Sequence, residues 1–313
     1  MVGGAVSRSL LTMSGRTLIV LALGALPTTM SCRRAPATPS AAVALPSEHA
    51  GAAEMEMTIV YDNNSYDHSL RMAWGFGCVI ALRGLTILFD TGGDGAILLS
   101  NMRELGIAPE SIDLIVLSHI HGDHVGGLQA FLEENHDVTV YVPASFPDSF
   151  ARKVRQSGAR LDRISAPQEL APGVYTTGEL DGPVREQSLI LSTEAGVVVA
   201  TGCAHPGVTR IVERAKSIVS DDIALVVGGF HLGGHSESQI EAIVRRFQEL
   251  GVRFAAPCHC SGGLAREKFR QAYGSRCLPA GVGYRISSKA LLLQQRPPPT
   301  KPGAAEGAAQ QVR

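Results

Sequence analysis

The sequence is short of cysteine, of net charge and of long apolar runs. Six cysteines among 313 residues are too few for a fold that disulfides hold together. The 28 basic and 29 acidic residues nearly balance and are mixed along the chain, so a nucleic-acid partner is not expected. A hydrophobic content of 45% still allows a sizeable core, and the length fits one α/β domain with two tails.

The first 32 residues have the order of an export signal. Arg8 and Arg16 precede the apolar run 17–26, and small and polar residues then lead to Cys32. Such a run is about half of what a helix needs to cross a bilayer, so a signal peptide is favoured over a transmembrane anchor. Ser31 before Cys32 resembles a lipoprotein processing site, but the usual Leu three positions before the cysteine is missing. We expect the protein to be exported, either to the periplasm or as a lipoprotein that is anchored to the membrane through Cys32. If Cys32 is not lipidated, it is an incidental residue of the leader.

Two low-complexity segments flank the predicted domain, which covers residues 57–290. Residues 33–56 and 291–313 are rich in small residues and proline, and they bury too little apolar surface to offset chain entropy. We therefore predict a disordered linker and a disordered tail. The long segment 143–185 is only weakly periodic and contains several Pro and Gly residues, so we expect a lid or substrate loop there.

The central part of the chain alternates between two hydrophobic patterns. Short β-branched runs predict strands at 57–61, 77–82, 86–89, 114–117, 138–142, 188–192, 197–200 and 223–227. Amphipathic stretches predict helices at 97–105, 127–134, 208–218, 238–250 and 264–273. Strands that alternate with helices predict a layered α/β domain.

One polar cluster follows the apolar run 114–117 directly. It contains four potential metal ligands, namely His119, His121, Asp123 and His124. In an extended loop, residues two apart point the same way, so His119 and His121 can bind one ion together. Gly122 would allow a sharp turn that directs the next two ligands toward a second position. Imidazoles with one carboxylate suit zinc, with iron or manganese as alternatives, and this setting favours metal binding over a histidine-rich surface loop.

Three more histidines follow apolar segments. His205 comes after 197–200, His231 after 223–227 and His259 after 253–256. One loop cannot complete the coordination of an ion, and α/β folds assemble sites where strand ends meet. We therefore expect these histidines at the same site, with a structural core histidine as the alternative for each. Asp90, which also ends a strand, is expected to accept hydrogen bonds from loop backbone and from a ligand histidine, rather than only to form a turn.

The cysteines near these motifs are less informative. Cys258 and Cys260 flank His259, but a C-x-C pair without a second pair is a weak zinc signal. Burial, or one disulfide after export, is favoured for them. Cys203 is ambiguous, because the sequence offers no activating partner for a nucleophilic thiol.

Together these motifs resemble the metallo-β-lactamase superfamily, whose H-x-H-x-D-H loop is matched at His119, His121, Asp123 and His124. One branch is similar in more detail. It includes the archaeal 7,8-dihydropterin-6-methyl-4-(β-D-ribofuranosyl)aminobenzene-5′-phosphate synthases and bacterial relatives, and the matching segments are 74–77, 87–94, 186–189, 202–207, 228–232 and 257–260. The resemblance covers residues 57–290. It implies an αββα sandwich, the metallo-β-lactamase fold, with a metal centre between the strand-end loops.

The resemblance also implies two ligand sets. The first metal would be held by His119, His121 and His205, and the second by Asp123, His124 and His259. Up to two divalent ions are therefore expected, with zinc as the favoured metal. His231 would stand near the substrate as a hydrogen-bond donor or proton carrier, and Asp123 could orient the nucleophile. The bridging Asp that is usual in the family is missing, because Cys203 follows Gly202 here. Glu186 is a candidate replacement, or it is an ordinary residue at the core edge.

Hydrolysis by metal-activated water is the leading expectation. A divalent ion lowers the pKa of bound water toward ~7 and polarises the bond under attack, as in esters, phosphoesters and lactones. One alternative is a synthase-type transfer that releases pyrophosphate, although export argues against a cytoplasmic cofactor pathway. The other is a metal-binding module without turnover, which an incomplete second site would allow. The expected partner is a small-molecule substrate, and the oligomeric state is left open.

Overall fold

A computed structural model describes residues 53–294 of the protein. The expected leader, residues 1–32, and most of the predicted linker and tail lie outside the described residues. Within the described range, none of the helices combines the length and the apolar character that crossing a bilayer requires.

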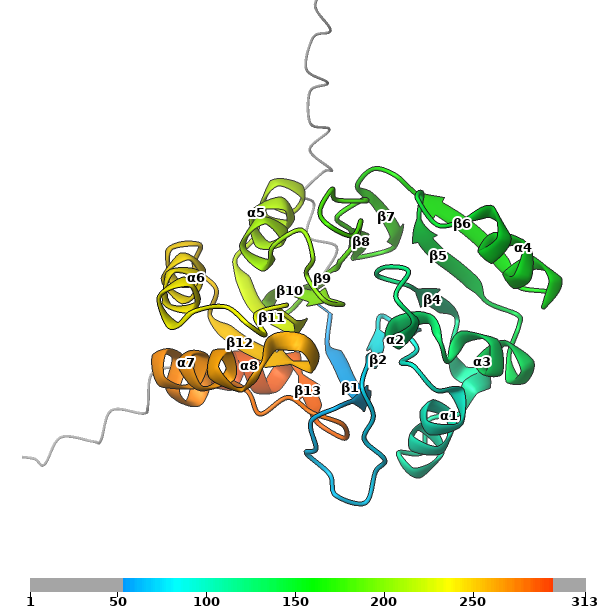
Figure 1. The fold of residues 1–313 in the computed structure, drawn as a ribbon, viewed down its shortest axis with the longest axis horizontal. Helices are drawn as coiled ribbons and strands as arrows, with labels where there is room; N and C mark the ends of the chain where they lie inside the picture. Colours follow the sequence, from blue (N-terminus) through cyan, green and yellow to red (C-terminus); the bar gives the residue numbers. More distant parts are fainter. Residues whose placement is uncertain (1–52, 295–313) are drawn as a thin grey trace, which may run out of the picture. The chain divides into compact units, whose positions relative to one another are not determined.

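Two β-sheets pack face to face at the centre of the domain (Figure 1). The first has the order β13-β1-β2-β3-β4-β5-β6 and the second the order β12-β11-β10-β9-β8-β7. The strands of the first sheet are Arg285–Ser287 (β13), Met55–Asp62 (β1), Phe76–Leu82 (β2), Leu85–Phe89 (β3), Leu114–Val116 (β4), Thr139–Pro143 (β5) and Arg160–Ile164 (β6). Those of the second are Phe254–Cys258 (β12), Ile223–Gly229 (β11), Gly196–Thr201 (β10), Leu189–Thr193 (β9), Val174–Thr176 (β8) and Gln168–Ala171 (β7).

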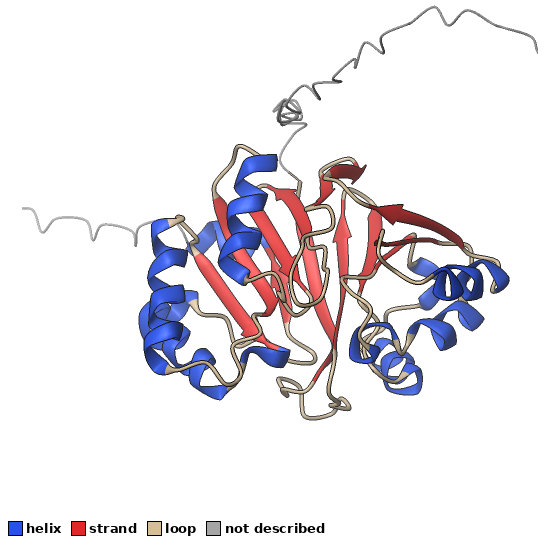
Figure 2. Ribbon diagram, turned by 45° about the horizontal axis from the view of Figure 1, so that its top comes forward, coloured by secondary structure: helices blue, strands red, loops and turns tan. Residues whose placement is uncertain are grey.

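Helices lie on the outer sides of the sheets (Figure 2). Those near the first sheet are Gly95–Glu104 (α1), Gly122–Val125 (α2), Leu128–Glu134 (α3) and Asp148–Gln156 (α4). Those near the second are Val208–Ile218 (α5), Glu237–Glu249 (α6) and Gly263–Tyr273 (α7), and Ser288–Gln294 (α8) follows β13. Short 3-10 helices are Pro109–Ser111, His259–Ser261 and Gly274–Arg276. This layering confirms the expected αββα sandwich.

The side chains of β10 show why these strands are continuous apolar runs. Val198 and Ala200 belong to the core between the two sheets, whereas Val197 and Val199 belong to the core beneath the outer helices. Successive side chains of a strand point to opposite faces, and here both faces are buried. The helix α5 packs on this second core, beneath the outer helices, with one stripe of buried residues: Val208, Ile211, Val212, Ala215 and Ile218. All predicted strands and helices are present, with ends within two residues of those expected.

Most of the segment 143–185 forms regular elements instead of the expected lid or substrate loop, although residues 177–185 form a loop in which Gly182 lies against the His205 backbone. The segment contains α4 and three strands, of which β6 closes one edge of the first sheet and β7, with β8 beside it, closes an edge of the second. These strands have three to five residues and partly exposed faces, so their alternation was too short to detect in the sequence. The ordered elements also extend past the predicted domain boundaries, because β1 begins at Met55 and α8 ends at Gln294.

The strands that precede the histidine motifs end level with one another. Phe89 of β3 pairs with Val116 of β4 in parallel, and Thr201 of β10 pairs with Gly228 of β11 in the other sheet. Gly229 pairs in turn with Cys258 of β12. Because neighbouring parallel strands end at one edge, the loops after them share a rim, which is where α/β folds place their sites.

Candidate metal centre

The loop after β4 and the first turn of α2 carry the densest group of polar side chains. His119 and His124 are buried, His121 is exposed, and the side chain of Asp123 is 22% exposed. Gly122 begins α2 and does not have the positive φ that a glycine-dependent turn requires. The helical turn itself therefore directs Asp123 and His124, which corrects the role expected for this glycine.

Three imidazoles form the first group of potential ligands, and they are His119, His121 and His205. His119 Nε2 lies 3.1 Å from His121 Nδ1. The His205 ring centroid is 4.8 Å from that of His119 and 4.9 Å from that of His121. His205 Nε2 is buried and has no hydrogen-bond partner among residues 53–294. The structure thus brings together the three side chains that were expected to share one ion.

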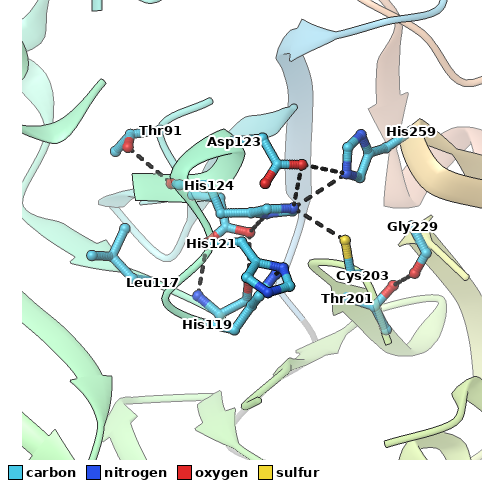
Figure 3. Close-up of polar contacts among 12 residues, drawn as sticks. Thr91, Leu117, His119, His121, Asp123, His124, Thr201, Cys203, Gly229 and His259 are labelled. Atoms are coloured by element: carbon cyan, nitrogen blue, oxygen red, sulfur yellow. Dashed lines mark hydrogen bonds and ion pairs between the residues drawn. The ribbon is translucent and has the colours of Figure 1, made fainter. Parts of the chain in front are cut away.

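A second group surrounds His124 Nε2 (Figure 3). This nitrogen lies 3.2 Å from His259 Nε2 and 3.2 Å from Cys203 Sγ. Asp123 Oδ2 is 3.6 Å from His124 Nε2 and 3.3 Å from His259 Nε2. The structure thus adds Cys203 to Asp123, His124 and His259, which were the side chains expected at the second position.

Cys203 belongs to both sides of the centre. Besides the group around His124, its thiol forms a third group of potential ligands with His205 and His231. From the sequence the role of this cysteine was open, although its position two residues after the end of β10 was the available signal. The five cysteines among the described residues are free thiols, so the disulfide considered for Cys258 or Cys260 is not formed within this part of the chain.

Glu186 anchors the loop that carries Cys203 and His205. Its Oε1 accepts hydrogen bonds from the backbone N–H groups of Cys203 and Ala204, at 2.9 and 2.8 Å, and its Oε2 accepts one from His205 at 2.8 Å. Burial raises the pKa of Glu186 to about 7, although the amide hydrogen bonds oppose this shift. Glu186 lies in none of the three ligand groups found among the described residues. The hypothesis that it replaces the bridging carboxylate is therefore corrected, because its oxygens are used by the loop backbone.

Asp90 holds the other side of the centre in place. Its Oδ2 accepts hydrogen bonds from His124 Nδ1 and from Ser118 Oγ, both at 2.7 Å, and its Oδ1 accepts one from Ser118 N at 2.7 Å. The expected role of Asp90 is thus confirmed. A side chain at Gly202 would collide with Ser118, so this glycine allows the loops of the two sheets to meet.

The backbone at the centre is strained. Asp90, Ala204, His231 and His259 have φ between 46° and 62°, a region that residues other than glycine rarely adopt. Such conformations persist only where the surrounding structure enforces them, and they cluster at functional sites.

A family model for the metallo-β-lactamase superfamily matches residues 78–259. The chain belongs to the metallo-β-lactamase superfamily. It is 30% identical over 232 residues to the 7,8-dihydropterin-6-methyl-4-(beta-D-ribofuranosyl)-aminobenzene-5'-phosphate synthase of Methanocaldococcus jannaschii, which covers 60% of this chain and 79% of the relative.

Solved structures of the superfamily are also similar. Tm1679, a metal-dependent hydrolase of the β-lactamase superfamily, matches with a TM-score of 0.62 and 26% identity over 74% of this chain and 98% of that one. The metallo-β-lactamase fold protein YhfI from Bacillus subtilis matches with a TM-score of 0.58 over 75% of this chain and 99% of that one. Its 15% identity shows a shared fold only.

The donor set of this metallo-β-lactamase fold fits divalent metal ions. Zinc with bonds to nitrogen of about 2.0–2.1 Å in a tetrahedron holds neighbouring donors roughly 3.3 Å apart. The contacts of 3.1 and 3.2 Å between imidazole nitrogens match that spacing. An ion would also satisfy the buried His205 Nε2, which otherwise has no partner among the described residues.

Protonation equilibria of the metal-free protein favour the ligand forms at the first position. Burial lowers the pKa of His119, and the neighbouring histidines lower it further. Burial, with His231 and His121, lowers the pKa of His205 to about 4. Both imidazoles are therefore neutral at pH 7, which is the form that binds metal.

Negative charge surrounds the second position. Burial opposes ionisation of Asp123, but the hydrogen bond from His259 and the charge of His124 outweigh it, so the pKa of Asp123 is lowered. Burial likewise opposes protonation of His124, but Asp90 outweighs it and the pKa of His124 is raised. The position thus attracts a cation, whether a proton or a metal ion.

Two residues behind His259 were missed in the sequence. Asn63 Oδ1 lies 2.9 Å from His259 Nδ1, and Asp62 Oδ2 accepts a hydrogen bond from the His259 backbone N–H at 3.1 Å. Both orient the ring so that Nε2 faces the centre. They belong to β1 and the loop after it, so no local pattern linked them to His259.

His231 lies beside the first group, with its ring centroid 4.3 Å from that of His205. A hydrogen bond with Cys260 raises the pKa of His231, although its partial burial opposes this. The imidazole is exposed on the solvent side of the centre. It thus lies where a side chain could exchange protons with a bound small molecule.

Proposed function

We propose that the protein is a metal-dependent hydrolase of small-molecule esters, phosphoesters or lactones. It would bind up to two divalent ions, of which zinc is the favoured metal. The observation that carries this proposal is the convergence of imidazole nitrogens from distant loops on two small groups of potential ligands, above all His124 Nε2 and His259 Nε2 at 3.2 Å. The ligands proposed for one ion are His119, His121 and His205, and those for the other are Asp123, His124, His259 and Cys203.

Metal ions bound there would supply hydroxide at neutral pH and polarise the bond under attack. The chain's own groups provide the remaining functions. Asp123 is ionised and partly exposed, so it can accept a hydrogen bond from the attacking water and orient it. His231, with its raised pKa and its exposure, can donate a proton to the leaving group. Asp90 fixes the loop after β4 and the His124 ring, and Glu186 fixes the loop after β10.

Activity screening of the zinc-loaded protein tests this proposal. We expect zinc-dependent turnover in a panel of aryl esters, phosphodiesters and lactones, with a large loss of kcat in His231→Gln at unchanged zinc content. His136→Ala, which alters an exposed histidine away from the ligand groups, is the control. Stoichiometric zinc without any turnover would instead support a metal-binding module. This alternative is relevant because Cys203 stands where the family usually has a bridging carboxylate.

A synthase-type transfer is the second candidate, because the Methanocaldococcus jannaschii relative at 30% identity is named for such a reaction. A pyrophosphate-release assay with a dihydropterin diphosphate and an aminobenzene acceptor distinguishes it from hydrolysis. Release that depends on the acceptor would favour the transferase, whereas release with water alone would favour the hydrolase.

We also propose that the protein is exported. The support is the order of basic, apolar and small residues before Cys32. Intact-mass measurement of protein from the native envelope should show a mature chain that begins near Cys32. An acyl increment on Cys32 would favour a lipoprotein over a periplasmic protein, and a mature terminus at Met1 or Met13 would refute export.

A further inference from the structure

Trp74, the only tryptophan of the chain, lies beside the metal centre. Its ring centroid is 5.0 Å from that of His259, with the two ring planes at 56°. His259 is buried, but Trp74 is 61% exposed. The indole therefore touches a proposed metal ligand and leaves most of its surface open to solvent.

The backbone of Trp74 is held against the centre. A side chain at Gly75, whose φ is +141°, would collide with the carbonyl oxygen of Asp123. One at Gly93 would lie 3.3 Å from the carbonyl oxygen of Trp74. The backbone of Trp74 and Gly75 is thus packed closely against the loop after β3 and against the turn that carries Asp123. A rigid contact surface of this kind costs little ordering entropy when a ligand binds.

The exposure of Trp74 differs from that of a scattered surface residue. Single exposed apolar side chains are ordinary, but this one adjoins a ligand group.

We propose that Trp74 is a specificity-determining residue that stacks on a planar aromatic ring of the substrate while the reacting group lies at the metal centre. This inference rests on the proposed function. An open, rigid indole suits offset stacking, in which ring centroids lie roughly 4.5–7 Å apart. An alkyl group gains less there, because it has no π-system and lacks the contribution that aromatic pairs gain beyond buried area. A cationic group would also bind an indole, but the nearby metal ions would repel it.

Two metal-binding ligands that differ only in the ring test the inference. The zinc-loaded full-length protein is titrated with phenylphosphonate and with cyclohexylphosphonate, and calorimetry gives both Kd values. We expect phenylphosphonate to bind more tightly by roughly two- to tenfold. It should also change the fluorescence of the single tryptophan. Trp74→Ala should remove the preference by weakening phenylphosphonate alone, and Trp74→Phe should retain most of it.

Met72→Ala is the matched control, because Met72 lies on the same loop and is 54% exposed. It should leave both Kd values unchanged, and an equal loss in this variant would overturn the assignment to Trp74. Equal affinities in the parent protein, or a preference that survives Trp74→Ala, would overturn the stacking while the proposed hydrolase stands. Failure of both phosphonates to bind the zinc-loaded protein would overturn the proposed function, and this inference with it.

Discussion

Replacing Asp90 by Asn should weaken one metal position selectively. The carboxylate accepts three hydrogen bonds, one of them from His124 Nδ1 at 2.7 Å. An Asn carbonyl can keep the bond from the Ser118 backbone, but its NH₂ group then faces the other two donors. The Ser118 hydroxyl can rotate to accept from that NH₂ group. His124 cannot do the same without moving its proton to Nε2, the atom proposed to bind metal.

The magnitude follows from that one lost contact. A hydrogen bond to a charged group contributes about 1.5–3 kcal/mol, and 1.4 kcal/mol corresponds to a tenfold change in affinity. We therefore expect the affinity at the His124 position to fall by roughly 10- to 150-fold, which overlaps the range typical for groups that orient metal ligands. Among the described residues, His119 is linked to Asp90 only through Ser118 Oγ, which lies 2.9 Å from His119 Nδ1. That hydroxyl oxygen can still accept from His119 after it rotates, so the other position should change little.

Chelator competition measures both affinities. Zinc should leave the parent protein in two steps, and Asp90→Asn should shift only the step that involves His124. His259→Ala identifies this step, because His259 belongs only to the ligand group around His124. Asp113→Asn is the control, since Asp113 accepts a backbone hydrogen bond from Thr86 at the opposite end of β4. Equal weakening of both steps, or no change in either, would refute the reasoning.

Three further predictions concern the same groups. His121→Ala should lower the zinc content by elemental analysis and His136→Ala should not; equal contents would contradict the ligand assignment. Glu186→Gln leaves one of three backbone N–H donors unpaired, so chelator titration should show weaker binding at both positions, and unchanged binding would show that another group fixes the loop. Because the pKa of His205 is held at about 4 by burial, the metal-free protein should lose stability as the pH falls from 6.5 toward 4. Urea unfolding at pH 7.5 and pH 5 measures this loss as a difference in the free energy of unfolding. The same difference in His205→Ala as in the parent protein would contradict the prediction.

The sequence alone determined the layers of the fold and the core of the site. Buried runs such as 197–200 and amphipathic stretches such as 208–218 are local patterns that each element must show to bury its own apolar face. The four polar residues of the loop after β4 lie within six positions, so their proximity did not depend on the rest of the chain. These features were therefore predictable from residue spacing.

Only the tertiary structure decided how the centre is completed and supported. Cys203 meets His124 across 79 positions, and Asp62 meets His259 across 197, because two sheets pack face to face and end at one rim. The role of Glu186 was equally hidden, since its acceptors are satisfied by the backbone of a loop from another strand. Edge strands such as β7 likewise form only because a partner strand is present. Local patterns specify elements, whereas contacts between distant segments depend on packing that no short window of sequence contains.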